Sequence, residues 1–165
     1  MNKFLIVLIV ILIAVIGYFL IPKSGSEEII QGPEREESTT VKVFFNNDDL
    51  DPEFSCNKVF PVERKIFKTQ AVGKASLQKL LKGPTEEEKA EGFFTNINKG
   101  VKIQSLIIEN GLAKVDFNEQ LEFQVGGSCR VAAIRAQITE TLKQFPTVNE
   151  VLISINGRTE DILQP

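Results

Sequence analysis

Residues 103–118 read IQSLIIENGLAKVDFN, and this stretch holds the clearest structural signal in the chain. Two apolar, alternating runs flank Asn110-Gly111. A two-residue type I′ turn needs positive φ at both central positions, which Asn and Gly tolerate. The stretch therefore predicts a β-hairpin, with these side chains on one face: Ile108 opposite Ala113, Leu106 opposite Val115, and Phe117 beside them.

Three further segments have the pattern of β-strands. Residues 41–45 place alternate apolar side chains on one face and predict a first strand. Residues 59–66 are a second candidate, and Pro61 places this strand at a sheet edge because Pro donates no ladder hydrogen bond. Residues 151–155 predict the last strand.

Two segments have helical periodicity. We expect Thr69 to cap the first helix, and the Gly-Pro pair at 83–84 to end it. Residues 85–88 then have the sequence of a capping box that starts a short helix. We expect Ser128 to cap the second long helix, which ends before Pro146. Its apolar stripe consists of five residues: Val131, Ile134, Ile138, Leu142 and Phe145.

These elements predict an α+β fold. We expect a mostly antiparallel sheet with the two main helices packed on one face. The chain contains no internal repeat.

The composition excludes several classes of chemistry. The 165 residues include 19 Lys+Arg, 22 Asp+Glu, two Cys and no His. Without His, a Ser-His-Asp triad, a Cys-His pair and an imidazole-ligated metal are impossible. A net charge of −3 argues against nucleic acid, which requires a basic stripe. We therefore expect no catalytic residues, no cofactor and no metal site.

Residues 1–21 are predicted to form a signal-anchor transmembrane helix. Residues 4–21 carry no charge, and a helix of that length spans about 27 Å, enough to cross a hydrocarbon core. The run lacks the cleavage site of a signal peptide, and the first cysteine available for lipidation is Cys56. Lys3 precedes the helix and Lys23 follows it, so the distribution of positive charge indicates its orientation only weakly. The position of the helix at the N-terminus, as a signal-anchor, favours a cytoplasmic N-terminus and a C-terminal domain outside the cytoplasm.

Residues 22–40 are interpreted as an acidic linker, and residues 41–165 as the domain that it carries. The linker has two Gly, two Pro and several Ser and Thr. A segment with so little to bury does not repay its ordering entropy, so we expect a solvated spacer. Its charges sum to −3, the net charge of the whole chain: Lys23, Arg35, Glu27, Glu28, Glu34, Glu36 and Glu37.

The two cysteines favour a disulfide. Cys56 and Cys129 are separated by 73 positions, and two lone thiols in a small domain outside the cytoplasm most simply pair. Closing such a loop contributes about 4 kcal/mol in the chain-entropy model. The alternative is a reactive Cys129, which lies before Arg130 at a helix start where a thiolate is stabilised.

One acidic stretch resembles the start of a calcium-binding loop. Asn47, Asp49 and Asp51 have the spacing of the first EF-hand ligands. However, Pro52 replaces the glycine at position six and Lys58 replaces the glutamate at position twelve. A solvated loop is therefore the preferred interpretation.

Two glycine-containing segments are weaker candidates. The Gly-Gly-Ser segment at 126–128 precedes a helix, where backbone N–H groups can hold an anion. The Asn-Gly-Arg segment at 156–158 ends the last strand and is either a surface turn or a contact point.

Several motifs occur in the order that the GerMN domain family has: Leu80–Thr85, Glu88 with Gly92, Val115–Phe117, Gln137–Leu142, Phe145–Val148 and Val151–Gly157. From residue 41 to about residue 160 the chain resembles this family of sporulation and germination proteins. The resemblance implies an extracytoplasmic, non-enzymatic α+β module that assists protein assembly at a membrane. It offers no catalytic residues to transfer, and Asn98 stands where family members often have Pro.

Three functional hypotheses follow. The first is a single-pass protein of the cell membrane whose extracytoplasmic domain, without catalysis, binds other envelope proteins or itself. In this hypothesis the lipid bilayer holds the N-terminal helix, and nucleic acid is not a partner. The second is an envelope enzyme that uses a reactive thiol or carboxylates, and the third is a receptor for a cell-wall or small-molecule ligand.

Overall fold

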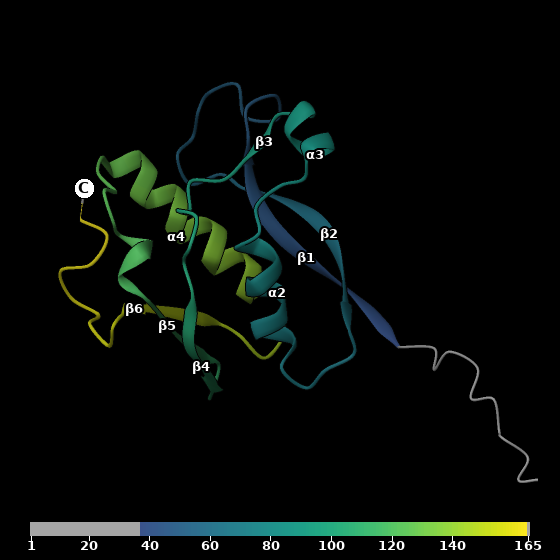
Figure 1. The fold of residues 1–165 in the computed structure, drawn as a ribbon, viewed down its shortest axis with the longest axis vertical. Coiled ribbons are helices and arrows are strands. Elements are labelled where there is room, and N and C mark those ends of the chain that lie inside the picture. The colour runs from purple at the N-terminus through teal and green to yellow at the C-terminus, as the bar shows by residue number, and fades with distance from the viewer. Residues whose placement is uncertain (1–36, 165) are drawn as a thin grey trace, which may run out of the picture. The chain divides into compact units, whose positions relative to one another are not determined.

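The computed structural model describes residues 37–164 (Figure 1). The predicted transmembrane helix, residues 1–21, and the linker as far as residue 36 lie outside this range. Among the residues that the structure describes, no helix combines the length and the apolar character needed to cross a bilayer.

The first sheet has three antiparallel strands in the order β2-β1-β3. Their bounds are β1 Ser38–Asn47, β2 Phe60–Phe67 and β3 Phe93–Phe94. The predicted edge position of the strand that contains Pro61 is confirmed, because β2 pairs with β1 alone. Strand β1 begins three residues before residue 41, since Ser38–Thr40 already pair with Lys65–Phe67.

The second sheet has the order β4-β5-β6, with β4 Ile103–Glu109, β5 Leu112–Phe117 and β6 Glu150–Ile155. Its hairpin is the one predicted, since Ile108 lies opposite Ala113 and Leu106 opposite Val115. Strand β6 runs parallel to β5. The prediction of one mostly antiparallel sheet is therefore corrected to two sheets with one parallel pair. A parallel pair needs a crossover connection, and α4 provides it. The chain leaves β5 at its C-terminal end, and α4 carries it back so that β6 starts beside the N-terminal end of β5.

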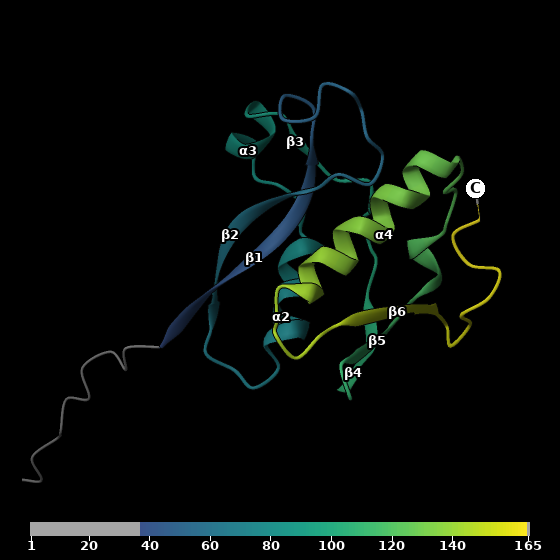
Figure 2. The same ribbon diagram turned by 180° about the vertical axis from the view of Figure 1, so that it is seen from behind.

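Two long helices lie between the sheets (Figures 1 and 2). The helical segments are α2 Val72–Leu80, α3 Glu86–Ala90, the short 3₁₀ helix η1 Glu119–Leu121, and α4 Ser128–Lys143. Helix α2 contacts β1, β2 and β4, while α4 contacts β1 and β6. The two main helices thus contact both sheets, whereas the sequence predicted that they cover one face of a single sheet.

One hydrophobic core joins the helices to both sheets. Four of the five residues in the predicted stripe of α4 are buried, and Phe145 is half-buried against them. Burying a side chain of this size stabilises the fold by about 1.5–3 kcal/mol. The fully buried side chains from other elements include Val43, Phe45, Leu77, Leu80, Val115, Phe117 and Ile155.

The predicted capping box at the start of α3 is confirmed. The Thr85 hydroxyl accepts from the Glu88 backbone N–H at 3.3 Å, and the Glu88 carboxylate accepts from the Thr85 backbone N–H at 2.9 Å. Each partner satisfies a backbone donor that the first helical turn leaves free.

The predicted caps of the two long helices are wrong. Thr69 accepts from the backbone N–H of Ala71 at 3.1 Å and so forms a turn ahead of α2, whose N-cap is Ala71 itself. Ser128 is already the first residue of α4, and Gly127 is the N-cap with φ of 86°. The positive φ of this glycine turns the chain into the helix one residue earlier than the serine pattern indicated.

The hairpin turn has the backbone that the sequence predicted. Asn110 has φ of 51° and Gly111 has φ of 82°. The Gly111 carbonyl also accepts from the N–H groups of Asn149 and Glu150, at 2.7 and 3.0 Å. The turn therefore fixes the start of β6 as well as the β4–β5 register.

We expect Gly111→Ala to lower the free energy of unfolding by roughly 1–3 kcal/mol, because an L side chain is strained at this φ. The added Cβ would also lie 2.5 Å from Nδ2 of Asn149. Gly126→Ala is the control, since φ there is not positive and a Cβ meets nothing within 4 Å. Urea unfolding measures both, and equal losses would contradict this role of the turn.

Candidate functional site

A disulfide joins Cys56 to Cys129, with 4.8 Å between the two Cα atoms. It fastens the loop after β1 to the first turn of α4. Both cysteines of the chain are consumed, so no thiol is free. The hypothesis of a reactive Cys129 therefore lacks its nucleophile in this structure.

A buried polar cluster lies beside the disulfide. Gln137 has no solvent exposure; its amide donates to Oδ1 of Asn46 at 2.7 Å and accepts from the Thr95 hydroxyl at 2.7 Å. Asn96 donates to the same Asn46 oxygen, and Asn46 donates to the Lys58 carbonyl at 3.0 Å. Among the described residues, no buried side-chain nitrogen or oxygen lacks a partner. The cluster thus links β1, α4 and the loop after β3 through hydrogen bonds that leave none of its buried side-chain polar atoms unpaired.

Residues 47–51, whose spacing resembles the start of a calcium-binding loop, form a turn. The Asn47 side-chain oxygen accepts from the Asp49 backbone N–H at 2.9 Å, and its amide donates to the Glu91 carbonyl at 2.8 Å. Asp51 pairs with Lys58, with 3.6 Å between the charged atoms. Within residues 37–164, no group of acidic and cysteine side chains is placed to hold a metal ion.

The C-terminal half of α4 bonds to the edge of β1. The Gln144 side-chain amide accepts from the Lys42 N–H at 2.8 Å and donates to the Lys42 carbonyl at 2.6 Å. The Thr141 hydroxyl accepts from the Phe44 N–H at 3.2 Å. Sequence reasoning missed these contacts, although Gln137, Thr141 and Gln144 have the i, i+4, i+7 spacing of one helix face.

A charged pair joins β2 to α3. The Arg64 guanidinium contacts both carboxylate oxygens of Glu88, at 2.5 and 2.6 Å. Both side chains are mostly buried, with 14% and 15% exposed, and the guanidinium lies 5.9 Å from the centre of the Phe45 ring. Hydrogen bonds from Arg64 lower the pKa of Glu88 below its ordinary value of 4.5, and the Thr85 backbone N–H lowers it further against the effect of burial.

Of the two glycine-containing candidates, the segment at residues 156–158 is engaged in internal contacts. Asn156 and Gly157 form a turn of positive φ after β6, and the Gly157 N–H donates to Asp116 at 2.8 Å. Arg158 pairs with Glu122, which makes this segment an internal contact point.

At the start of α4, Arg130 donates to Asn98 at 2.7 Å, and Asn98 donates to the carbonyls of Gln120 and Phe123. The asparagine that departs from the family pattern thus holds the loop before α4. The structure supplies no further support for an anion site at residues 126–128.

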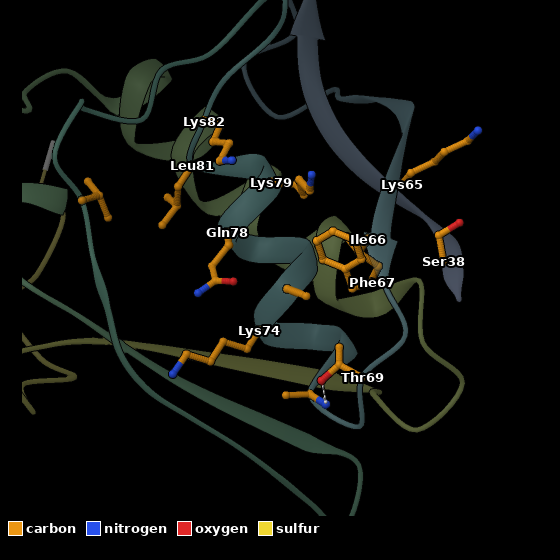
Figure 3. Close-up of a pocket in the computed structure, with 13 residues that line it drawn as sticks. Ser38, Lys65, Ile66, Phe67, Thr69, Lys74, Gln78, Lys79, Leu81 and Lys82 are labelled. Atoms are coloured by element: carbon orange, nitrogen blue, oxygen red, sulfur yellow. Dashed lines mark hydrogen bonds between the residues drawn. The ribbon is translucent and has the colours of Figure 1, made fainter. Parts of the chain in front are cut away.

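A groove of about 720 Å³ separates β2 from α2 (Figure 3). Ile66, Leu81 and Val101 give it a largely apolar lining. Phe67 lies between β2 and α2, and 69% of its surface is exposed. Four cationic side chains also border the groove, and no carboxylate does: Lys65, Lys74, Lys79 and Lys82. This groove is the best candidate for a binding surface in the described part of the chain.

The chain matches a known family model over most of its length. Residues 42–161 match the family model described as Germane, sporulation and spore germination. No protein with curated function matches the chain.

Solved structures with a similar fold include the following three. The tandem GerMN domains of the sporulation protein GerM from Bacillus subtilis superpose with a TM-score of 0.58 at 17% identity, over 74% of this chain and 41% of that one. The first GerMN domain of GerM gives 0.54 at 20% identity, over 73% and 85%. A putative lipoprotein from Clostridium perfringens gives 0.50 at 17% identity, over 77% and 80%. The chain thus spans about two fifths of the tandem structure, and the resemblance to the GerMN family is confirmed.

We expect Glu88→Gln to lower the free energy of unfolding at neutral pH by roughly 2 kcal/mol, since it removes charged hydrogen bonds from Arg64. The folded-state pKa of Glu88 is lowered, so its stabilising effect is complete above the unfolded pKa and is lost as pH falls through the folded one. Unfolding curves of wild type and variant should therefore converge as pH drops below 4.5.

Glu86→Gln in the same helical turn is the control for this measurement. The Glu86 side chain is 85% exposed and pairs only with Lys89 in the structure, so its loss should cost less than about 1 kcal/mol. A Glu88 variant that stays equally weakened down to pH 3 would contradict the assignment to the ionised carboxylate.

Proposed function

The chain belongs to the Germane family of sporulation and spore germination, and from this premise we propose that it is a non-catalytic binding or assembly module of the bacterial cell envelope. In this proposal residues 1–21 anchor it in the cell membrane and the domain acts outside the cytoplasm. Its partners are the lipid bilayer, through that helix, and other envelope proteins or a second copy. Nucleic acid is not a partner.

The Cys56–Cys129 disulfide is the observation that carries the proposal. A stable disulfide is typical of an oxidising compartment outside the cytoplasm. The same bond removes the thiol that the thiol-dependent form of the enzyme hypothesis requires. The similar protein from Clostridium perfringens is described as a putative lipoprotein, and lipoproteins are held at membranes of the cell envelope. This likeness supports an envelope location for the chain.

A receptor for a cell-wall or small-molecule ligand is the second candidate, and the groove between β2 and α2 favours it. Its volume of about 720 Å³ suits a small ligand. However, its polar groups are mostly flexible lysine side chains, whereas small-ligand sites use a few convergent, fixed polar groups. The groove therefore supports a protein partner more strongly.

We expect the protein purified from the envelope without reductant to lack two thiol hydrogens by intact mass. Reduction should lower its free energy of unfolding by about 4 kcal/mol, because the closed loop is long. Recovery of two free thiols from the envelope fraction would contradict the location outside the cytoplasm.

A photocrosslinking amino acid placed in turn at several exposed positions of the full-length chain tests the assembly function in cells. Suitable positions are Phe54, Lys74, Ile107, Lys114 and Leu152. We expect a discrete adduct from at least one position, containing either an envelope protein or a second copy. The absence of adducts from every position would overturn the assembly function.

A further inference from the structure

We propose that the groove between β2 and α2 binds an acidic peptide segment of a partner protein, in extended conformation, as a strand added to the free edge of β2. The inference rests on the proposed binding function and names the chemistry of its partner. Three features of the groove carry it: its charge, its apolar lining and the unpaired backbone of β2.

The backbone direction follows from the bonds on the other side of β1. The Lys42 and Phe44 N–H groups donate to α4, so they point away from β2. In an antiparallel pair, directly opposed residues point their backbone groups alike, either toward each other or both away. Lys42 lies opposite Glu63, and the alternation continues along β2. The N–H and C=O groups of Lys65 and Phe67 therefore point outward from the sheet.

These outward groups are available to a ligand. Among the hydrogen bonds made outside the β1–β2 ladder within residues 37–164, none involves the backbone N–H or C=O of Lys65 or Phe67. The alternation described above takes these groups out of the ladder itself. Lys65, Ile66 and Phe67 all border the groove, and α2 borders it on the other side. An exposed edge of this kind is a template for strand addition, in which backbone bonds supply affinity and side-chain pockets supply specificity.

The charge of the groove selects an acidic segment. Its four lysines face no carboxylate among the residues that line it, although the chain as a whole is acidic, with a net charge of −3. Figure 3 shows Lys79 on the side of α2 that faces β2, while Lys65 projects outward from β2. Lys65 and Phe67 are two residues apart and share one face of β2, so one set of side chains on an added strand would lie beside them. The alternate set, pointing toward α2, would meet Lys79 and Leu81. Carboxylates in the set toward α2 would pair with Lys79, and apolar side chains in the other set would pack on Phe67.

A fluorescein-labelled peptide of alternating glutamate and isoleucine is the probe, added to the full-length chain in uncharged detergent. Fluorescence anisotropy should detect saturable binding, and a lysine–isoleucine peptide should not bind. Lys79→Glu should weaken binding at least tenfold. Lys114→Glu is the matched control, because Lys114 is exposed on β5 outside the groove, and it should leave binding unchanged.

Strand addition is tested by removing backbone donors. Lys65→Pro deletes an N–H that points outward, a position where an edge strand tolerates proline, and it should weaken binding at least tenfold. Lys65→Gln removes only the charge and should weaken binding less than threefold. If the proline variant fails to fold, a peptide N-methylated at alternate residues provides the same test on wild-type protein, and it should bind at least tenfold more weakly.

Three results would overturn the inference. The first is peptide binding that is indifferent to Lys79→Glu, and the second is binding that N-methylation of the peptide leaves intact. The third is Lys79-dependent binding to phosphatidylglycerol vesicles with no binding of the peptide, which would assign the groove to a membrane surface. If any of these three results is found while the photocrosslinking experiment yields adducts at positions outside the groove, the assembly function stands. Only the assignment of peptide binding to the groove is then rejected.

Discussion

The side-chain amide of Gln144 both accepts from and donates to the backbone of Lys42, as a neighbouring strand would. Strand β1 needs this substitute because β3 covers only Asn46 and Asn47 on that edge. Thr141 supplies the next bond, and Gln137 reaches the Asn46 side chain from the same helix face. The Phe44–Thr141 bond is partly buried, and leaving such a backbone group unpaired costs about 1–3 kcal/mol. Helix α4 therefore completes the first sheet with polar side chains while its apolar stripe packs in the shared core.

The local parts of this fold were predictable, and the long-range parts were not. Asn110-Gly111 specified the hairpin and its register because both turn positions demand the same unusual backbone. The capping box at Thr85 was equally local. The contacts of Gln144 with Lys42 join residues 102 positions apart, and no pattern within either segment reveals the partner. The single predicted sheet became two for the same reason, because periodicity indicates strands but does not say which strands pair.

The candidate site shows the same division. The Cys56–Cys129 pairing followed from counting two cysteines in one domain. In the stretch with calcium-like spacing, the side chain of Asn47 forms a turn by accepting from the Asp49 N–H. The groove was not predicted, because its lysines come from β2 and from α2 and the stretch just after it. A surface assembled from separate elements becomes visible only when the sheet edge and the helix are placed together.

The disulfide also has a mechanical consequence. If tension acts between the two ends of the domain's chain, it enters at β1, reaches Cys56, crosses the sulfur–sulfur bond and leaves through Cys129. The residues between the two cysteines, more than half of the domain, lie outside this load path. Force can strip β1 from its neighbours, but it cannot lengthen the enclosed segment, which includes β2, α2 and the groove. The oxidised domain can therefore extend less under tension than the reduced domain, in which the enclosed residues join the load path.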